Sequence, residues 1–293
     1  MQLPFLVCIA ILLPACAQHS ASYTPHLAFL KPVRITIKGY SGNCMEPFIT
    51  RDGSTLLFNN LNAAPENTNL HWATRINDST FEYKGEITGV NTDSLEGVPS
   101  MDSLGNLYFI SNRSYSNTLS TIYHCNFSNG AATSISLVKG VSKQKPWWVD
   151  FDVEISTDGQ TLYFTDGRFN NSNNPETADL VIAEKDGTGF KRLANSDAIM
   201  ENINTGGLEY GACISADQLT LYFTRVPLPL TQTSAPEIMV ATRNSKDEPF
   251  SIPSKIESIT GFAEAPTIAP SQQIVYYHKK EDGRFVLYMV RKE

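Results

Sequence analysis

A short motif of apolar and aromatic residues recurs along this chain, at intervals of roughly 50 to 60 residues. The copies lie at 56–58, 107–109, 162–164, 221–223 and 275–277. Each copy follows a predicted turn, and two of these turns contain Asp-Gly, at Asp52-Gly53 and Asp158-Gly159. A repeat of this length cannot bury its apolar face alone, so the copies are expected to pack against one another.

Each repeat predicts several short β-strands joined by hairpins. The first strand precedes the turn and the recurring motif forms the second, because Asp-Gly supplies the backbone freedom that a tight turn needs. A third strand is predicted at 70–75, 121–125, 179–183, 237–243 and 285–290. A fourth is predicted at 81–87, 132–138, 190–193 and 250–256. The fifth repeat reaches Glu293 directly after its third strand, so its fourth strand is expected from another part of the chain.

The segment 33–38 is the candidate for that strand, because Val33, Ile35 and Ile37 alternate with polar residues. We therefore predict an all-β chain that forms a five-bladed β-propeller of four-stranded blades. In this prediction the N-terminal strand completes the last blade, closes the ring and removes the exposed sheet edge. An open solenoid would need polar terminal caps, which the sequence lacks. Six blades remain an alternative count.

Composition agrees with an all-β prediction and argues against nucleic-acid binding. The 293 residues include 12 Tyr and 15 Phe, and 41% are hydrophobic, which is enough to build a core. The formal charge is -7 and the 23 basic residues are scattered, so no basic surface is indicated.

The N-terminus resembles an export signal, because residues 3–13 are almost wholly apolar and small residues follow. We predict a signal at 1–17, a linker at 18–32 and the propeller at 33–293. Cleavage after Ala17 would release the protein, whereas acylation of Cys16 would tether it to a membrane as a lipoprotein, and we favour the lipoprotein slightly. No later apolar stretch is long enough to span a bilayer.

The three remaining cysteines, Cys44, Cys125 and Cys213, are about 80 residues apart and show no paired spacing. We predict buried free thiols, with one disulfide and one leftover thiol as the alternative.

The phrase Glu-x-Pro-x-(Ile/Phe)-Ser-x-Asp-Gly-x-x-Leu-Tyr-Phe, built from segments such as 46–58 and 154–164, resembles the WD40-like propeller repeat of TolB-type periplasmic proteins. The resemblance covers about 33–293. It implies the propeller fold and an exported protein, and the chain looks most like single-domain members of unassigned role. Because one fold hosts many functions, the resemblance implies no activity.

An acidic residue precedes the first strand of every repeat, which predicts a rim of carboxylates near the central channel. These residues are Glu46, Glu96, Asp150 with Asp152, Glu209 and Glu264. Basic residues follow the second strands at Arg113, Arg168, Arg225 and Lys279, and antiparallel pairing places them on the same rim. Ion pairs repeated with the unit are the favoured interpretation. A structural cation and a glycoside hydrolase-like pair of acids are the alternatives.

Adjacent tryptophans, Trp147 and Trp148, are the most unusual local feature. We predict a ligand-binding site from Trp147, Trp148, Asp150 and Arg168, next to a polar loop at 166–177. In an extended segment the two rings point opposite ways, so at most one faces a ligand. Packing between blades is the competing interpretation.

His71, His124 and His278 show no metal-binding spacing and are interpreted as ordinary strand residues. The sequence also lacks the common hydrolase and nucleotide motifs, so we predict no cofactor and no metal site. The function we favour is an exported, periplasmic or membrane-tethered binding module or scaffold for an envelope protein or a glycan, and not an enzyme. The alternative is a carbohydrate-active enzyme that uses two or three of Glu46, Glu96, Asp150, Glu209 and Glu264.

Overall fold

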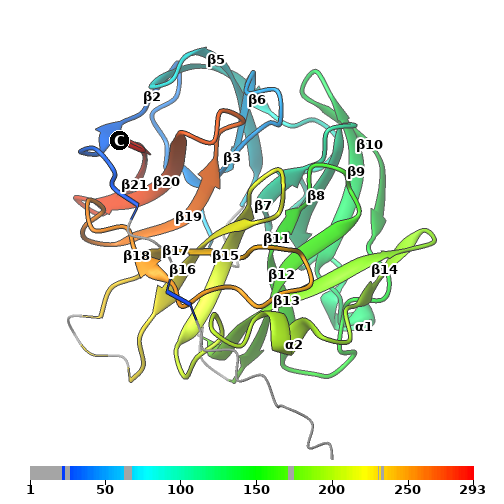
Figure 1. The fold of residues 1–293 in the computed structure, drawn as a ribbon. Coiled ribbons are helices and arrows are strands. Elements are labelled where there is room, and N and C mark those ends of the chain that lie inside the picture. Colours follow the sequence, from blue (N-terminus) through cyan, green and yellow to red (C-terminus); the bar gives the residue numbers. More distant parts are fainter. Residues whose placement is uncertain (1–21, 24–26, 63–67, 171–174, 230, 232–233) are drawn as a thin grey trace, which may run out of the picture.

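The computed structural model describes residues 22–23, 27–62, 68–170, 175–229, 231 and 234–293, and most of them lie in β-strands (Figure 1). The helices among these residues are two of one turn each, α1 (Tyr115–Thr118) and α2 (Ser196–Ile199), and turns and loops connect the strands. The predicted all-β class is therefore confirmed. The predicted signal at 1–17 and Cys16 lie outside the described residues.

The strands form sheets of four, four, eight and five strands, which we divide into five groups of four antiparallel neighbours, here called units. Unit 1 contains β3 (Met45–Ile49), β4 (Thr55–Asn59), β5 (Leu70–Asn77) and β6 (Thr80–Glu86). Unit 2 contains β7 (Glu96–Met101), β8 (Asn106–Ser111), β9 (Ile122–Ser128) and β10 (Ala131–Leu137). Unit 3 contains β11 (Trp148–Ile155), β12 (Thr161–Phe169), β13 (Pro175–Asp186) and β14 (Gly189–Arg192). Unit 4 contains β15 (Leu208–Ile214), β16 (Thr220–Val226), β17 (Glu237–Thr242) and β18 (Ser254–Lys255). Unit 5 contains β19 (Ala263–Ile268), β20 (Ile274–Glu281), β21 (Arg284–Arg291) and β1 (Val33–Arg34).

The N-terminal segment divides between two units, which corrects the prediction of one strand at 33–38. Strand β1 pairs antiparallel with β21, and β2 (Thr36–Lys38) pairs parallel with β6. The N–H of Ile35 donates to Leu287 O (2.8 Å), and the N–H of Thr36 donates to Ser79 O (2.9 Å). Successive N–H groups of an extended chain point to opposite sides, so one segment can bond to both neighbours. Figure 1 shows this blue segment beside the red C-terminal strand.

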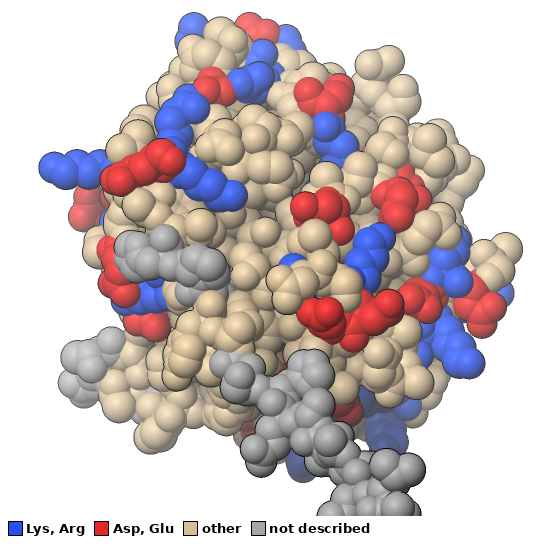
Figure 2. All heavy atoms as spheres, in the orientation of Figure 1, with Lys and Arg blue, Asp and Glu red and all other residues tan. Residues whose placement is uncertain are grey.

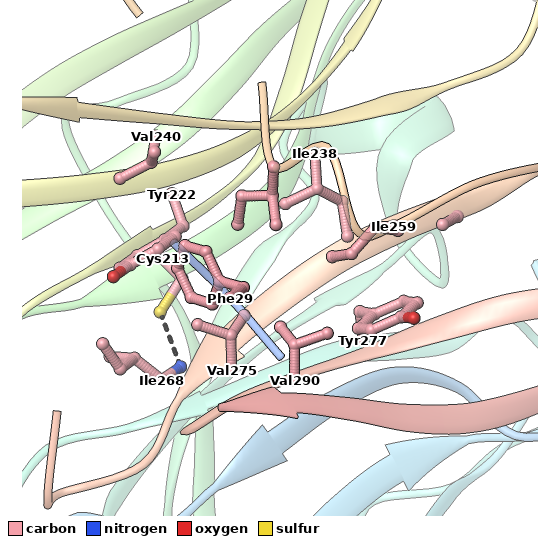
Figure 3. Close-up of a cluster of buried hydrophobic side chains, with 12 residues drawn as sticks. Phe29, Cys213, Tyr222, Ile238, Val240, Ile259, Ile268, Val275, Tyr277 and Val290 are labelled. Carbon is pink, nitrogen blue, oxygen red and sulfur yellow. Dashed lines mark hydrogen bonds between the residues drawn. The ribbon is translucent and has the colours of Figure 1, made fainter. Parts of the chain in front are cut away.

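The folded region extends into the segment predicted as a linker. Phe29 forms an isolated antiparallel β-bridge with Lys292 through the backbone. Its side chain is buried in a hydrophobic cluster contributed by units 4 and 5 (Figure 3). In the same cluster, Cys213 Sγ accepts a hydrogen bond from the N–H of Ile268 (3.1 Å). Cys44, Cys125 and Cys213 are free and buried, as predicted.

The repeated Ser-x-Asp phrase is explained by the turn between the first and second strands. Ser156 Oγ donates to Asp158 Oδ1 (2.5 Å), and the N–H of Gln160 donates to the same oxygen (3.1 Å). Gly159 follows with φ +69°, a conformation that most other residues adopt at a cost. The equivalent bonds join Thr50 to Asp52 and Ser215 to Asp217, so the phrase stabilises the turns of units 1, 3 and 4.

Hydrogen bonds also connect successive units through their inner strands. In each of these hydrogen bonds a backbone N–H of one unit donates to a side chain of the preceding unit. The bonds run from Val98 to Asn59 Oδ1 (3.0 Å), from Ile155 to Ser100 Oγ (3.0 Å), from Gly211 to Asp152 Oδ2 (2.8 Å), from Ile268 to Cys213 Sγ (3.1 Å) and from Ile49 to Thr267 Oγ1 (3.4 Å). The last of these bonds joins unit 1 to unit 5. The inner strands of successive units are thus hydrogen-bonded to their neighbours, and the candidate site lies among these strands.

Candidate functional site at the centre of the inner strands

Every inner strand contains an irregularity in its pairing with the second strand of its unit. Each irregularity contains a residue with positive φ: Glu46 (48°), Val98 (53°), Asp152 (54°), Gly211 (62°) and Ala265 (54°). A bulge inserts one extra residue and changes the direction of the side chains around it. A left-handed conformation costs about 1–2 kcal/mol at each non-glycine residue, so the surrounding structure must enforce these five equivalent positions.

The six acids of the predicted rim do not occupy equivalent positions relative to the bulges. We call the positive-φ residue of each inner strand its bulge residue. Three acids lie two residues before it: Glu96, Asp150 and Glu209. Glu264 lies one residue before it, and Glu46 and Asp152 are themselves bulge residues. The bulge interrupts the alternation of side chains, so a residue on or beside the bulge faces differently from a residue two positions before it. The acids therefore form two sets, defined by these positions.

The first set forms ion pairs, as the favoured interpretation of the rim acids predicted. Glu96 Oε1 lies 3.0 Å from Arg113 Nη2, and Glu209 Oε1 lies 2.8 Å from Arg225 Nε. Both carboxylates are completely buried. Each also accepts hydrogen bonds from a threonine that precedes the strand, Thr92 or Thr205. These acids hold the rim of their unit together.

Asp150 belongs to the first set but has a different partner from the one predicted. Its Oδ1 lies 3.3 Å from Nη2 of Arg192, which also binds both oxygens of Asp166 (2.6 Å each). Burial, followed by the hydrogen bond and charge of Asp166, raises the pKa of Asp150 to about 8. Arg168 instead lies 3.4 Å from Glu176, near the surface. The sequence could not indicate Arg192, because it lies in the fourth strand of the unit.

The second set, which we call the central acids, consists of Glu46, Asp152 and Glu264. Glu46 and Asp152 are each 8% exposed, and within the described part of the chain neither forms an ion pair. Asn62 Nδ2 donates to Glu46 Oε1 (2.7 Å), and the N–H of Gly211 donates to Asp152 Oδ2 (2.8 Å). Burial and the neighbouring carboxylates raise the pKa of both groups, that of Asp152 to about 7.

Glu264 has the most hydrogen-bond donors of the central acids. Tyr210 donates its hydroxyl proton to Oε1, and His278 Nε2 lies 3.0 Å from Oε2. The N–H of Glu46 donates to His278 Nδ1 (3.2 Å), so a neutral His278 carries its proton on Nε2 and donates it to Glu264. These two hydrogen bonds fix the orientation of the Glu264 carboxyl group.

His278 was wrongly interpreted as an ordinary strand residue. It occupies the position that Asn59 and Thr224 hold in units 1 and 4, where each side chain accepts a hydrogen bond from the bulge residue of the next unit. Aligning the repeats one residue beyond the recurring motif would have singled out this histidine.

Two of the central acids, Glu46 and Asp152, line a cavity of about 20 Å³, which has room for about one water molecule, whereas Glu264 does not line it. Val98, Gly211 and Ala265 complete its wall beside Glu46 and Asp152. Towards the turn side of the inner strands, Arg51 Nη2 binds Glu154 Oε1 (3.0 Å) and its Nε binds Met101 O (3.1 Å). This arginine thus joins the turn of unit 1 to the inner strands of units 2 and 3.

A larger groove of about 600 Å³ lies at the outer end of unit 3. Trp147, Trp148 and Arg168 line it together, as the predicted ligand-binding set requires, but Asp150 is buried away from it. Trp147 is 56% exposed, whereas Lys143 Nζ covers the ring of Trp148 at 3.4 Å from its centroid. The rings therefore differ in accessibility.

Among the described residues, neither a metal-binding cluster nor a membrane-spanning helix is found. No group of three His, Cys, Asp or Glu side chains there could hold a metal ion. No helix in the same ranges is long and apolar enough to cross a bilayer. Figure 2 shows Lys and Arg interspersed with Asp and Glu over the face in view.

No family model matches the sequence, and no curated protein is detectably similar to it. Among solved structures, a family 117 glycoside hydrolase from the marine bacterium Zobellia galactanivorans is 12% identical, with TM-score 0.57 over 90% of both chains. An α-L-arabinofuranosidase from Podospora anserina, in complex with cellotriose, is 10% identical, with TM-score 0.56 over 93% of this chain and 97% of the other. TolB from Acinetobacter baumannii is 15% identical, with TM-score 0.47 over 86% of this chain and 55% of TolB.

At these identities, the similarity to the two glycosidases shows the fold alone, and that fold is an all-β, propeller-like one. The TolB-type repeat is supported only as a β-propeller resemblance, because the TolB match is too weak to specify the type.

Proposed function

We propose that the protein is a carbohydrate-active enzyme of the glycoside hydrolase type, with its reaction centre at Glu46, Asp152 and Glu264. The observation that carries this proposal is the pair of buried carboxyl groups of Glu46 and Asp152, which have no basic partner among the described residues. The third acid, Glu264, is hydrogen-bonded through both of its oxygens. A purely structural rim would pair its acids, as Glu96 and Glu209 are paired.

The chemistry follows from the unequal environments of the central acids. Glycoside hydrolysis needs one carboxyl group that donates a proton to the leaving oxygen and one carboxylate that activates water or attacks carbon. The pKa of Asp152, raised to about 7 by burial, keeps its proton available near neutral pH. Glu264, held in orientation by hydrogen bonds to both of its oxygens, is assigned the second role.

Fold-level analogy adds modest support. Two of the solved structures with this fold are described as a glycoside hydrolase and an arabinofuranosidase. A shared fold transfers no activity by itself, so the proposal depends on the central acids.

The architecture we propose for this site is a closed, five-bladed ring in which each unit is one blade. The pairing of β1 with β21 and the bond from Ile49 to Thr267 support this proposal. In such a ring the inner strands converge, which would bring acids from units 1, 3 and 5 to one centre.

The test is hydrolysis of a panel of polysaccharides and aryl glycosides, followed by reducing-end assay. We expect turnover by the wild-type protein and a loss of about 10²–10⁴-fold in kcat for Asp152→Asn. The control is Glu82→Gln, which changes an exposed carboxylate in β6. Equal activity of the two variants, or no turnover on any substrate, would refute the proposal.

A non-catalytic binding module for a glycan or an envelope protein is the second candidate. The size of the spaces favours it, since the centre holds about 20 Å³ and the groove beside Trp147 about 600 Å³. Saturable binding to a glycan array or to an envelope extract, without any turnover, would establish this function in place of hydrolysis.

We also propose that the protein is exported and acts in the periplasm or as a lipoprotein. The apolar run at 3–13 and the small residues around Cys16 support export. The intact mass of the mature protein distinguishes acylated Cys16 from a chain that begins at Gln18.

A further inference from the structure

The groove at the outer end of unit 3 contains an aromatic side chain held in place for contact with a ligand. Trp147 is 56% exposed, and its φ of +70° is unfavourable for any residue other than glycine. The N–H of Phe169 donates to Trp147 O (2.8 Å), and Tyr115 Oη donates to Trp148 O (2.8 Å). Hydrogen bonds therefore hold the backbone around Trp147 in an unfavourable conformation, while its large apolar ring stays exposed to solvent. Neither the backbone strain nor the exposed ring stabilises the fold.

The polar side chains of the groove carry a local charge opposite to that of the whole protein. Lys145 and Arg168 contribute two positive charges and Glu176 one negative charge, in a chain of net charge -7. The pair between Arg168 Nε and Glu176 Oε2 is 3.4 Å long, and its side chains are 58% and 42% exposed. Such exposed pairs are weak, so an incoming carboxylate can replace Glu176 at Arg168.

The backbone of the groove leaves little opportunity for a peptide strand. Arg168 pairs with Trp148 on one side and with Thr177 on the other, so both edges of β12 are occupied there. A ligand must therefore be recognised through side chains. An exposed indole beside an arginine, a lysine and an amide suits a ring with one apolar face and charged or hydroxyl substituents at its edge.

The groove is connected to the central acids by a row of aromatic rings. Phe169 lines the groove and contacts Phe151, with centroids 5.8 Å apart. Phe151 contacts Tyr210 at 6.1 Å, and Tyr210 donates to Glu264. The groove and the central acids are thus linked by side-chain contacts within the packed part of the molecule.

We infer that the groove binds a segment of an acidic polysaccharide, with a sugar ring stacked on Trp147 and a uronate carboxylate bound by Arg168 and Lys145. This inference deepens the proposed carbohydrate function and rests on it. It adds the substrate class, which the central acids do not specify.

The experiment is calorimetric titration of the full-length protein with oligomers of galacturonate, of mannuronate-guluronate and of a glucuronate-containing glycan. Each oligomer is compared with its carboxyl-reduced form, which has the same rings without the charge. We expect at least one acidic oligomer to bind about tenfold or more tightly than its reduced form, because a charged hydrogen bond is lost on reduction. Equal affinities for every pair, or no binding of any acidic oligomer, would overturn the inference.

Two variants locate the binding in the groove. Trp147→Ala should weaken both forms about tenfold, and Arg168→Gln should weaken only the acidic form. The matched controls are Tyr23→Ala and Arg34→Gln, which remove an exposed aromatic ring and an exposed guanidinium elsewhere. Loss of binding in the controls, or none in the groove variants, would place the site elsewhere.

The two proposals can fail separately. Acidic oligomers that bind in the groove and are never cleaved would refute hydrolysis and leave the groove assignment intact. Cleavage of neutral substrates, with no preference for acidic oligomers, would refute the groove assignment and leave hydrolysis intact.

Discussion

The rim acids Glu96 and Glu209 and the central acids Glu46 and Asp152 occupy neighbouring positions on equivalent strands, yet their environments are opposite. Glu96 and Glu209 each bind an arginine and a threonine. Glu46 and Asp152 lie on the bulge residue, where the changed backbone direction turns them towards the centre and away from arginines. A displacement of two residues separates a structural carboxylate from a candidate functional one.

This difference has a thermodynamic meaning. A buried carboxylate with a charged partner stabilises the fold in its ionised form, whereas one without such a partner is easier to bury protonated. The structure tolerates this second arrangement at Glu46 and Asp152, together with an unfavourable backbone at both. Costs of this kind concentrate at functional sites.

The largest effect that would sharpen the comparison is on activity. Glu264→Gln should lower kcat by about 10²–10⁴-fold, because the amide cannot act as a base or nucleophile. Glu96→Gln should keep the rate per folded molecule, since Glu96 lies in the ion-paired set. The measurement is steady-state hydrolysis, and a normal kcat for Glu264→Gln would remove it from the reaction centre.

The next largest effect is on stability. Glu96→Ala leaves Arg113 and Ser111 without their buried partner, which should lower the free energy of unfolding by about 3–5 kcal/mol. Urea denaturation of wild type and variant gives this difference. A change below about 1 kcal/mol would mean that the ion-paired acids hold the rim no more strongly than surface pairs do.

The pH dependence of stability should have opposite signs in two regions. The pKa of Asp152 is raised in the folded state, so the folded protein binds more protons between about pH 4 and pH 7, and stability falls as pH rises through this window. Asp152→Asn, which keeps an acceptor for Gly211, should therefore raise the unfolding free energy at pH 8 and change it little at pH 4. Urea midpoints at both pH values measure this.

Asp217 is the matched comparison for that sign. Burial raises the pKa of Asp217, but hydrogen bonds from Ser215 and Leu219 outweigh burial and lower it. Asp217→Asn should accordingly destabilise the protein at pH 7, and this penalty should diminish as pH falls below the usual aspartate pKa. If both substitutions changed the unfolding free energy in the same direction above pH 7, Asp152 and Asp217 would not differ in the direction of their pKa shifts.

The smallest effect is expected at the surface of the groove. Glu176→Gln breaks an exposed pair with Arg168 and should change the unfolding free energy by less than about 0.5 kcal/mol. Urea denaturation again gives the value. A loss comparable to that of Glu96→Ala would show that Arg168 has a structural role, which would weaken its assignment to ligand binding.

Much of the fold was accessible from sequence, while the arrangement of the site was not. The strands of each unit were predicted from the alternation and the recurring turn, and the pairing of β1 with β21 from the alternation of Val33 and Ile35. The predicted partner of Asp150 was wrong, because Arg192 is 42 residues away and its position depends on the fourth strand. His278 was missed because its partners, Glu46 and Glu264, come from two different units.

The sequence alone indicated the all-β class, the recurring motif and the position of the turns, and it favoured free, buried cysteines. These features depend on interactions within a few residues or on residue type, so they can be read locally. Only the tertiary structure decided which acids are paired and which face the centre. That outcome depends on bulges that shift the strand by one residue and on contacts between units, and neither leaves a periodic signal in the chain.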